Sequence, residues 1–239
     1  MKFPDSFRKR GFTLLETVIA IGVLSVLLTG FMIVFAPAAA GIRKSINVQE
    51  ADRLASTLEQ ELVTFREGQS VSGSGKTGFA KAYEWIEKSN NEADALLIYQ
   101  YRGSLSSIRP DGTPEPVTTI KDKVPGKDYA VQSMVRRQSD ANFKNDLAAV
   151  EGGIYLVKCT QLVFDNGELK PGTAGTIKDP KGTGSPASSA DDYPEAVIAF
   201  SADFYTLPSK SPQYFSSAFK KTFAAAKVPV FTRNLAVRR

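Results

Sequence analysis

The longest apolar stretch of the chain lies near its N-terminus, where residues 12–40 contain one formal charge, Glu16. More than 18 consecutive, mostly apolar residues are enough to cross a bilayer as a helix. Pro37 lies inside the stretch, where a proline removes one helical hydrogen bond and usually kinks the helix. With Gly41 following it, the pattern predicts a membrane-spanning helix over residues 12–41.

A second, amphipathic pattern follows directly. Apart from one gap of eight, its apolar residues recur at spacings of three and four: Ile42, Ile46, Leu54, Leu58, Leu62 and Phe65. This periodicity is typical of a helix that buries one face and leaves the other in water. We expect it to end near Glu67 and Gly68. If it continues the first helix, residues 12–67 would extend roughly 80 Å at about 1.5 Å per residue.

The remainder alternates strand-like segments with turn signals. Apolar, β-branched and aromatic residues predict strands over residues 95–101, 129–137, 153–164, 195–207 and 228–237. Weaker helical patterns cover residues 79–88, 140–150 and 214–226. Turn or loop signals cover residues 68–78, 109–116, 165–168 and 170–194. The order predicts an α+β fold, in which an antiparallel sheet packs on the long helix.

Three parts follow from these patterns. Residues 1–11 form a short polar leader, and residues 12–41 form the membrane and assembly helix. Residues 42–239 would form the amphipathic helix together with a globular α+β head.

The net charge first suggests a nucleic-acid-binding protein, because the whole chain carries +5. The leader alone holds four basic residues against one acid, which is +3, so residues 12–239 carry only +2. We therefore expect no nucleic acid partner. The leader charge instead follows the positive-inside rule, which keeps that end of the chain in the cytoplasm.

The residue counts exclude several kinds of active site. The chain has no histidine, which removes the commonest general base and metal ligand and excludes Ser-His-Asp and Cys-His arrangements. Cys159 is the only cysteine, so no intramolecular disulfide is possible, and we interpret it as a small buried hydrophobe. The expected site therefore contains no catalytic residue, no cofactor and no metal, and the protein is not expected to be an enzyme.

Two weaker patterns are interpreted as structural. Residues 73–77 resemble the end of a phosphate-binding loop, but the full pattern needs a glycine where Ser70 stands and a strand before it. We therefore interpret them as a flexible loop. Four acids without the spacing of a calcium-binding loop are interpreted as solvated: Asp179, Asp191, Asp192 and Asp203.

The larger aromatic residues and two arginine pairs are interpreted in the same way. We expect the aromatic side chains to lie mostly in the core: Trp85, Tyr155, Phe164, Phe200, Phe204 and Tyr205. We expect the arginine pairs to be solvated: Arg136-Arg137 and Arg238-Arg239.

The segment that opens the apolar helix carries a more specific signal. A basic leader is followed by Gly11, Phe12 and, at the fifth residue after the glycine, Glu16. Over residues 8–40 this combination resembles the class III signal of type IV pilins and type II secretion pseudopilins. The resemblance implies that a membrane prepilin peptidase cuts between Gly11 and Phe12 on the cytoplasmic side and N-methylates Phe12. Its basic part here is formed by Arg8, Lys9 and Arg10.

The resemblance also implies partners and a location. The chain would be a structural subunit that assembles with other pilin subunits through its N-terminal helix, on an inner-membrane assembly platform. Before assembly it would span the lipid bilayer of the cytoplasmic membrane once, with its head outside the cytoplasm. After assembly it would belong to a periplasmic or surface filament. The size of the head and its long loops favour a minor subunit.

Glu16 has a specific role in this interpretation. A carboxylate within a membrane helix is unfavourable, by about 2.5 kcal/mol or more at the bilayer centre. Near the cytoplasmic edge the penalty is smaller, but the group still needs a partner. In the family, the implied partner is the N-terminal amine of a neighbouring subunit, which cleavage would create on Phe12. Such a pair attracts strongly in a medium of low dielectric constant and sets the axial register between subunits.

Several alternatives remain open at this point. The segment could be an uncleaved anchor of a single-pass membrane protein. It could also be a secretory signal cut after Ala40, although its apolar run exceeds the ~7–15 residues of a signal-peptide core. A third alternative is an adhesive or DNA-uptake pilin whose head binds a ligand. Because the tip subunit of secretion pseudopilins commonly lacks the acid, Glu16 argues against that position.

Overall fold

The computed structural model describes residues 13–69, 71, 76–181 and 186–239. The chain divides into two compact units, Met1–Glu50 and Ala51–Arg239. The second unit contains one antiparallel sheet with helices on both faces, which confirms the predicted α+β class.

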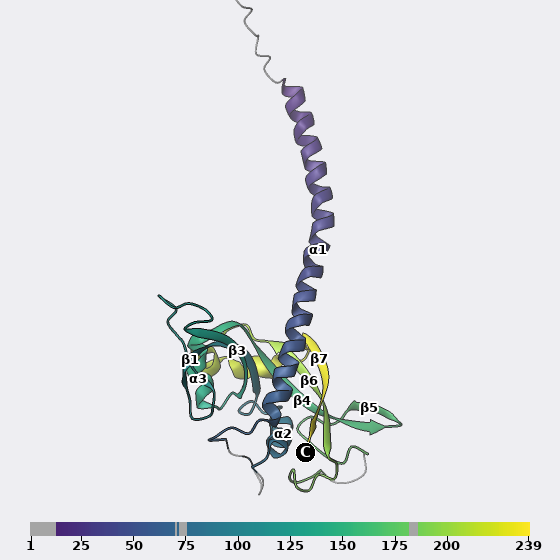
Figure 1. The fold of residues 1–239 in the computed structure, drawn as a ribbon. Helices are drawn as coiled ribbons and strands as arrows, with labels where there is room; N and C mark the ends of the chain where they lie inside the picture. The colour runs from purple at the N-terminus through teal and green to yellow at the C-terminus, as the bar shows by residue number, and fades with distance from the viewer. Residues whose placement is uncertain (1–12, 70, 72–75, 182–185) are drawn as a thin grey trace, which may run out of the picture. The chain divides into compact units, whose positions relative to one another are not determined.

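The sheet has seven strands: β1 (Leu96–Ile108), β2 (Pro114–Pro116), β3 (Tyr129–Arg137), β4 (Val150–Asp165), β5 (Glu168–Pro171), β6 (Val197–Thr206) and β7 (Phe231–Arg238). Every paired strand is antiparallel, in the order β2-β1-β4-β6-β7, with β3 also on β1 and β5 also on β4 (Figure 1). The helices are α1 (Leu14–Val63), α2 (Gly78–Lys88), α3 (Ala141–Asp146), the short 3-10 helix η1 (Leu147–Ala149), α4 (Pro212–Ser217) and α5 (Phe219–Ala225).

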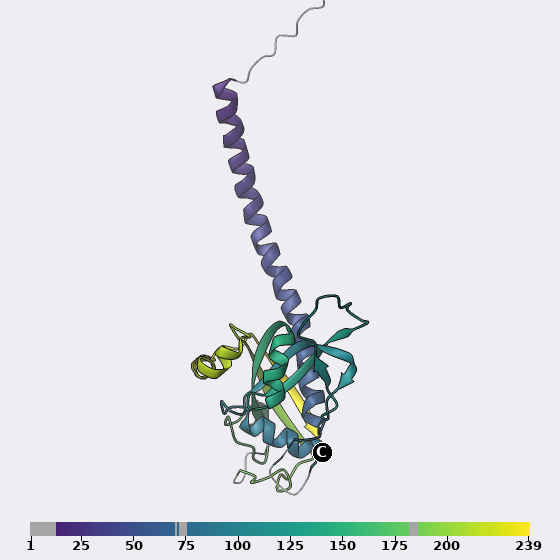
Figure 2. The same cartoon turned by 90° about the vertical axis from the view of Figure 1, so that its left-hand side faces the viewer.

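Two hydrophobic clusters lie on opposite faces of the sheet. On one face, residues of α1 and α2 pack with alternate side chains of β4 and β6, such as Val157 and Phe204. On the other face, residues of α3, α4 and α5 pack with the intervening side chains, such as Leu156 and Tyr205. This alternation follows from the two-residue period of a strand. The arrangement of the helices can be followed in Figures 1 and 2.

The long N-terminal helix is continuous and runs through Pro37. Its predicted apolar face is buried in the second unit, where Leu54, Leu58 and Leu62 are at most 1% exposed. The side chains of the predicted face at residues 42–48 lie outside the described part. The helix ends at Val63, whereas the sequence predicted an end near residues 67–68.

This earlier end follows from contacts between α1 and α2. The Lys81 ammonium donates to the carbonyl oxygens of Glu61 at 2.7 Å and Thr64 at 2.6 Å, and it pairs with the Glu61 carboxylate at 2.8 Å. These bonds satisfy carbonyl groups that a helix leaves without partners at its C-terminus. A Cβ at Gly78 would lie 2.1 Å from the Val63 carbonyl oxygen, so glycine is required where α2 begins.

The buried lysine gives this contact a measurable pH dependence. Burial lowers the pKa of the Lys81 ammonium to about 8, and the Glu61 carboxylate offsets part of that effect. The unfolded chain keeps a lysine pKa of about 10.4, so it binds more protons than the folded chain from about pH 8 to about pH 10. Titration of Lys81 should therefore add up to about 3 kcal/mol to the free energy of unfolding across this window. Urea unfolding of the detergent-solubilised chain from about pH 7 to about pH 10 measures the rise.

The control for this prediction is Lys81→Met, which keeps the length of the side chain and removes the titrating group. The other groups that titrate at high pH are common to both proteins. The variant should therefore lack the rise that Lys81 contributes, so its free energy of unfolding should increase less, or fall more, than that of the wild type between about pH 8 and about pH 10. Equal slopes for the two proteins would contradict the prediction.

Most predicted elements are present, with four further differences. The helix predicted over residues 214–226 is divided into α4 and α5, with Ala218 between them. Pro114 and Pro116 lie in the short strand β2, where the sequence predicted only a turn; prolines fit a strand of this kind because it lies at the sheet edge. Strand β5, absent from the prediction, follows the expected Asn166-Gly167 turn. The helix predicted over residues 140–150 ends earlier, because Val150 already begins β4.

Arg136 corrects the expectation of solvated arginines. It is 2% exposed, and its guanidinium pairs with Asp111 at 3.0 Å, Asp140 at 3.1 Å and Asp146 at 3.2 Å. Burial of a charge requires such compensation, and here it comes from other segments of the chain. Arg137 is also partly buried and pairs with residues of α2 and the loop before β1.

Most of the side chains expected in the core are buried. Cys159 is fully buried, as expected, and burial raises the pKa of its thiol to about 12. Four of the six aromatic side chains are buried: Trp85, Phe200, Phe204 and Tyr205. Phe164 is instead 51% exposed. The last two arginines are both exposed, as expected, although the Arg239 guanidinium also donates to two backbone carbonyl groups.

Candidate processing and assembly site

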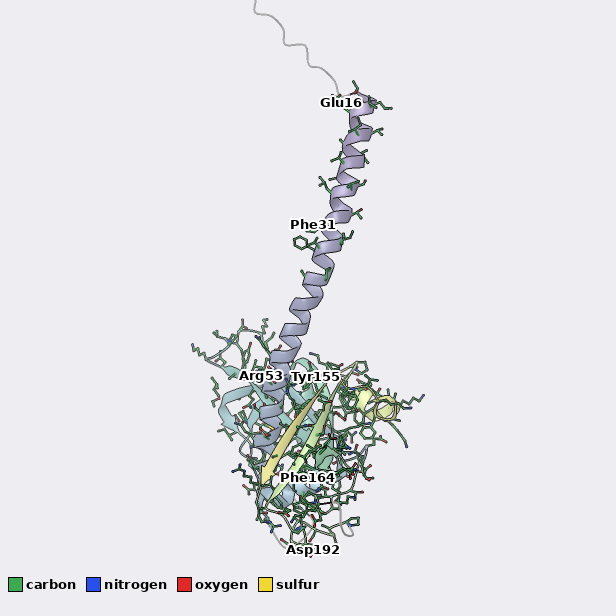
Figure 3. The ribbon with its side chains drawn as sticks, turned by 90° about the vertical axis from the view of Figure 1, so that its right-hand side faces the viewer. Glu16, Phe31, Arg53, Tyr155, Phe164 and Asp192 are labelled. Carbon is green, nitrogen blue, oxygen red and sulfur yellow. The ribbon has the colours of Figure 1, made fainter. Side chains whose placement is uncertain are left out.

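The structure describes only part of the predicted site, because the described residues begin at Thr13. The proposed cleavage residues Gly11 and Phe12 lie outside the described residues, as do the leader residues Arg8, Lys9 and Arg10. Glu16 lies inside them, in the first turn of α1 (Figure 3).

The structure shows that Thr13 and Glu16 form a reciprocal cap on α1. The Thr13 hydroxyl accepts a hydrogen bond from the Glu16 backbone N–H at 3.2 Å. The Glu16 carboxylate accepts one from the Thr13 backbone N–H at 2.9 Å and one from the Thr13 hydroxyl at 3.0 Å. This is a capping box, which satisfies two N–H groups that a helix otherwise leaves without partners.

Both hydrogen bonds from Thr13 go to the same carboxylate oxygen, Oε2 of Glu16. No partner for Oε1 is present among the described residues. Glu16 therefore combines a local role, in fixing where the helix begins, with a carboxylate oxygen that is available to another group. Sequence reasoning missed Thr13, although a threonine three residues before a glutamate is the usual signal of such a cap.

The first part of α1 presents an apolar surface. Leu14–Phe35 is predominantly apolar and is exposed throughout. Its 22 residues would extend about 33 Å at about 1.5 Å per residue, close to the ~30 Å of a bilayer core. By length and composition this helix can cross a membrane.

The hydroxyl groups in this segment are bonded within the helix. Ser25 donates to the carbonyl of Ile21 and Thr29 donates to that of Ser25, each at 2.8 Å. The rings of Phe31 and Phe35 stack with their centroids 3.8 Å apart, and Figure 3 labels the position of Phe31. The hydroxyl groups of Ser25 and Thr29 therefore need no partner from another chain. Glu16 is the one residue of the span with a formal charge, and its carboxylate can pair with a group of another subunit.

The weaker patterns of the sequence do not assemble into a site in the described part of the head. No group of three or more Cys, Asp or Glu residues suitable for a metal ion occurs there. Asp192 accepts hydrogen bonds from Ser188 and Ser189, and Asp203 accepts one from Thr232. Most of the segment that resembles a phosphate-binding loop lies outside the described residues.

Comparison with known proteins supports the N-terminal signal. Residues 6–32 match the family of the prokaryotic N-terminal methylation motif. Neither a curated protein nor a solved structure matches the chain.

The matched motif is the prepilin signal of type IV pilins and pseudopilins, so the chain carries a prepilin-type N-terminal signal. The motif implies processing by prepilin peptidase and assembly with other pilin subunits. Together with the one helix of the described residues that is long and apolar enough to cross a membrane, it fits a pilin that is anchored in the membrane by one span.

Proposed function

We propose that the chain is a minor structural subunit of a type IV pilus or of a type II secretion pseudopilus. The observation that carries this proposal is the methylation motif over residues 6–32, which includes Gly11, Phe12 and Glu16. The apolar span Leu14–Phe35 supplies the surface through which such subunits bundle. The role is structural rather than catalytic, and the head contributes contacts to other proteins.

The head supports the minor-subunit assignment. It contains a seven-stranded sheet with helices on both faces, and long irregular segments connect β2 to β3 and β5 to β6. A subunit present in many copies has to fit a repeating lattice at every position, which long irregular loops hinder. The presence of Glu16 argues against the tip position, because the tip subunit of secretion pseudopilins commonly lacks an acid there.

The orientation follows from the leader. Its net charge of +3 favours retention in the cytoplasm, and the head that follows the span then lies outside the cytoplasm. Before assembly the subunit resides in the inner membrane, and afterwards it forms part of a periplasmic or surface filament. An assembly platform in the inner membrane extracts it.

A substitution at Gly11 tests the cleavage site. Replacing Gly11 by glutamate places a charged side chain where the signal has glycine, and we expect at least about a tenfold loss of cleaved product, equivalent to ~1.4 kcal/mol. Intact mass after co-expression with prepilin peptidase measures the result. The wild-type product should begin at a methylated Phe12, whereas the variant should retain residues 1–11.

The matched control addresses the secretory-signal alternative. Ala38→Gln would block a conventional cut after Ala40, which would leave Gly41 as the first residue, and it should not affect a cut before Phe12. A Gly41 N-terminus in the wild type that disappears in this variant would overturn the proposed processing. So would a methylated Phe12 N-terminus that persists at wild-type yield in Gly11→Glu.

A further inference from the structure

Strands β4 and β6 separate before either of them ends. They pair from Tyr155↔Thr206 to Gln161↔Phe200. Beyond that point β4 pairs with β5, from Leu162↔Pro171 onward, and β6 has three further residues, 197–199, in its strand. The hairpin of β4 and β5 extends sideways from the rest of the sheet (Figure 1). Between the end of β4 and the start of β6 lies part of the segment that precedes β6, where the Phe164 N–H donates to the Pro180 carbonyl at 2.7 Å.

An apolar cleft of about 500 Å³ occupies this position. Its apolar lining comes from the ends of β4 and β6, from β5 and from the loop before β6: Leu162, Phe164, Leu169, Pro180, Val197 and Ala199. Two charged residues also line it, Lys181 and Glu195, and they pair with each other at 2.9 Å. The lining therefore carries no net charge and favours an apolar ligand over a charged one.

The cleft lies on the sheet face that α3, α4 and α5 cover only in part. Those helices pack on β4 near Leu156 and on β6 near Tyr205. Phe164 lies further along β4, at the end of the head near Asp192 and away from Arg53 (Figure 3). No helix among the described residues covers it there.

The exposure of the lining is unusual for a soluble surface. Phe164 and Leu169 are each 51% exposed and pair directly across β4 and β5, so their side chains lie on the same face. Val197, at the start of β6, adds a third exposed apolar side chain. A contiguous apolar surface of this kind usually marks a site of protein association.

We propose that this cleft receives an apolar side chain from the head of a neighbouring subunit in the filament. The inference rests on the proposed function, because the prepilin motif implies assembly with other pilin subunits. A subunit inside a filament contacts its neighbours through more than one surface, so a concave apolar site on its head can receive a protruding apolar group of the subunit beside it. The uncharged lining and the projecting hairpin match that kind of partner.

The first test introduces charge into the cleft. In the full-length chain, Phe164→Asp combined with Leu169→Asp should reduce recovery in sheared filaments by about tenfold, while N-terminal processing stays unchanged. The matched control is Ile120→Asp, since Ile120 is also apolar and 55% exposed but lies in the loop between β2 and β3. The melting temperature of each variant checks that its head is folded. Recovery equal to that of the Ile120 variant would overturn the inference.

A second test does not depend on the stability of the charged variant. Because Cys159 is fully buried, a cysteine placed at position 169 is the only reactive surface thiol. A maleimide-benzophenone label on Leu169→Cys should crosslink to another subunit in assembled filaments, whereas the same label on Ile120→Cys should not. Equal yields at the two positions would contradict the inference. If wild-type protein is absent from filaments altogether, the proposed function fails and not the cleft assignment alone.

Discussion

Replacement of Glu16 by glutamine is expected to permit cleavage before Phe12 but to reduce incorporation into filaments by at least about tenfold, equivalent to ~1.4 kcal/mol. Glutamine can keep the capping box with Thr13, since that motif accepts either residue at this position. It removes only the negative charge. The variant therefore separates the two roles of Glu16, the local cap and the pairing with the amine of a neighbouring subunit.

The expected loss has an electrostatic cause. A charge pair inside an apolar helix bundle is weakly screened, and removing one partner leaves the other buried without compensation, which typically costs about 3–5 kcal/mol. Intact mass reports processing, and the ratio of sheared to cell-associated protein reports incorporation. Glu59→Ala is the matched control, because Glu59 lies on the same helix but beyond the apolar span.

Glu16→Ala completes the series. It removes both the charge and the cap, and loss of the cap alone costs roughly 1 kcal/mol of helix stability. If the glutamine variant assembles at the wild-type level and only the alanine variant fails, the carboxylate serves as a helix cap and the register hypothesis is wrong.

Local sequence patterns account for the elements that the sequence predicted best. Asp140 caps α3 by accepting a hydrogen bond from the Asn142 backbone N–H at 2.8 Å, as its residue type indicated. The turn at Asn166 and Gly167 has φ angles of 53° and 84°, which these two residues adopt more readily than others. In both cases the determining atoms lie within a few residues of each other, so the sequence alone was sufficient.

The errors arose where the determining contact comes from a distant segment. The end of α1 depends on Lys81, twenty residues beyond Glu61. The burial of Arg136 depends on Asp111 and Asp146, which no local pattern connects to it. Spacing along one sequence cannot show these pairs, because they are set by how the strands associate.

The N-terminal signal could be recognised from the sequence alone, for a physical reason. It is a short linear motif over residues 6–32, so the spacing of its residues along the chain carries the information. The exposure of Phe164, in contrast, results from the separation of β4 from β6. That separation could be recognised only in the folded sheet.

Asp146 carries the largest predicted effect on the stability of the head. It is fully buried at the end of α3. One carboxylate oxygen accepts a hydrogen bond from the Arg109 guanidinium at 2.6 Å, and the other accepts bonds from the Tyr99 hydroxyl at 2.5 Å and from Arg136 at 3.2 Å. A single carboxylate therefore joins α3 to β3, to β1 through Tyr99 and to Arg109, the residue that follows β1.

The dependence of Arg109 on Asp146 makes this carboxylate hard to replace. One terminal nitrogen of Arg109, Nη1, is buried without a hydrogen-bond partner among the described residues. The other carboxylate near Arg109 belongs to Glu115, whose Oε2 lies 3.7 Å from the Arg109 Nε and whose side chain is exposed. The pKa of the Tyr99 hydroxyl is raised well above its usual value by burial and by the charge of Asp146, so Tyr99 remains a neutral donor.

Asp146→Asn should accordingly lower the free energy of unfolding by about 3–5 kcal/mol, because it leaves buried guanidinium groups without their counter-charge. Urea unfolding at neutral pH measures the loss. The matched control is Asp165→Asn, where an exposed carboxylate pairs with Lys170 at 3.3 Å and a change below about 1 kcal/mol is expected. Similar losses in the two variants would show that the buried network does not hold α3 to the sheet. A large loss at Asp146 alone would show that a charged cluster, and not only the apolar core, fixes the position of α3 against the sheet.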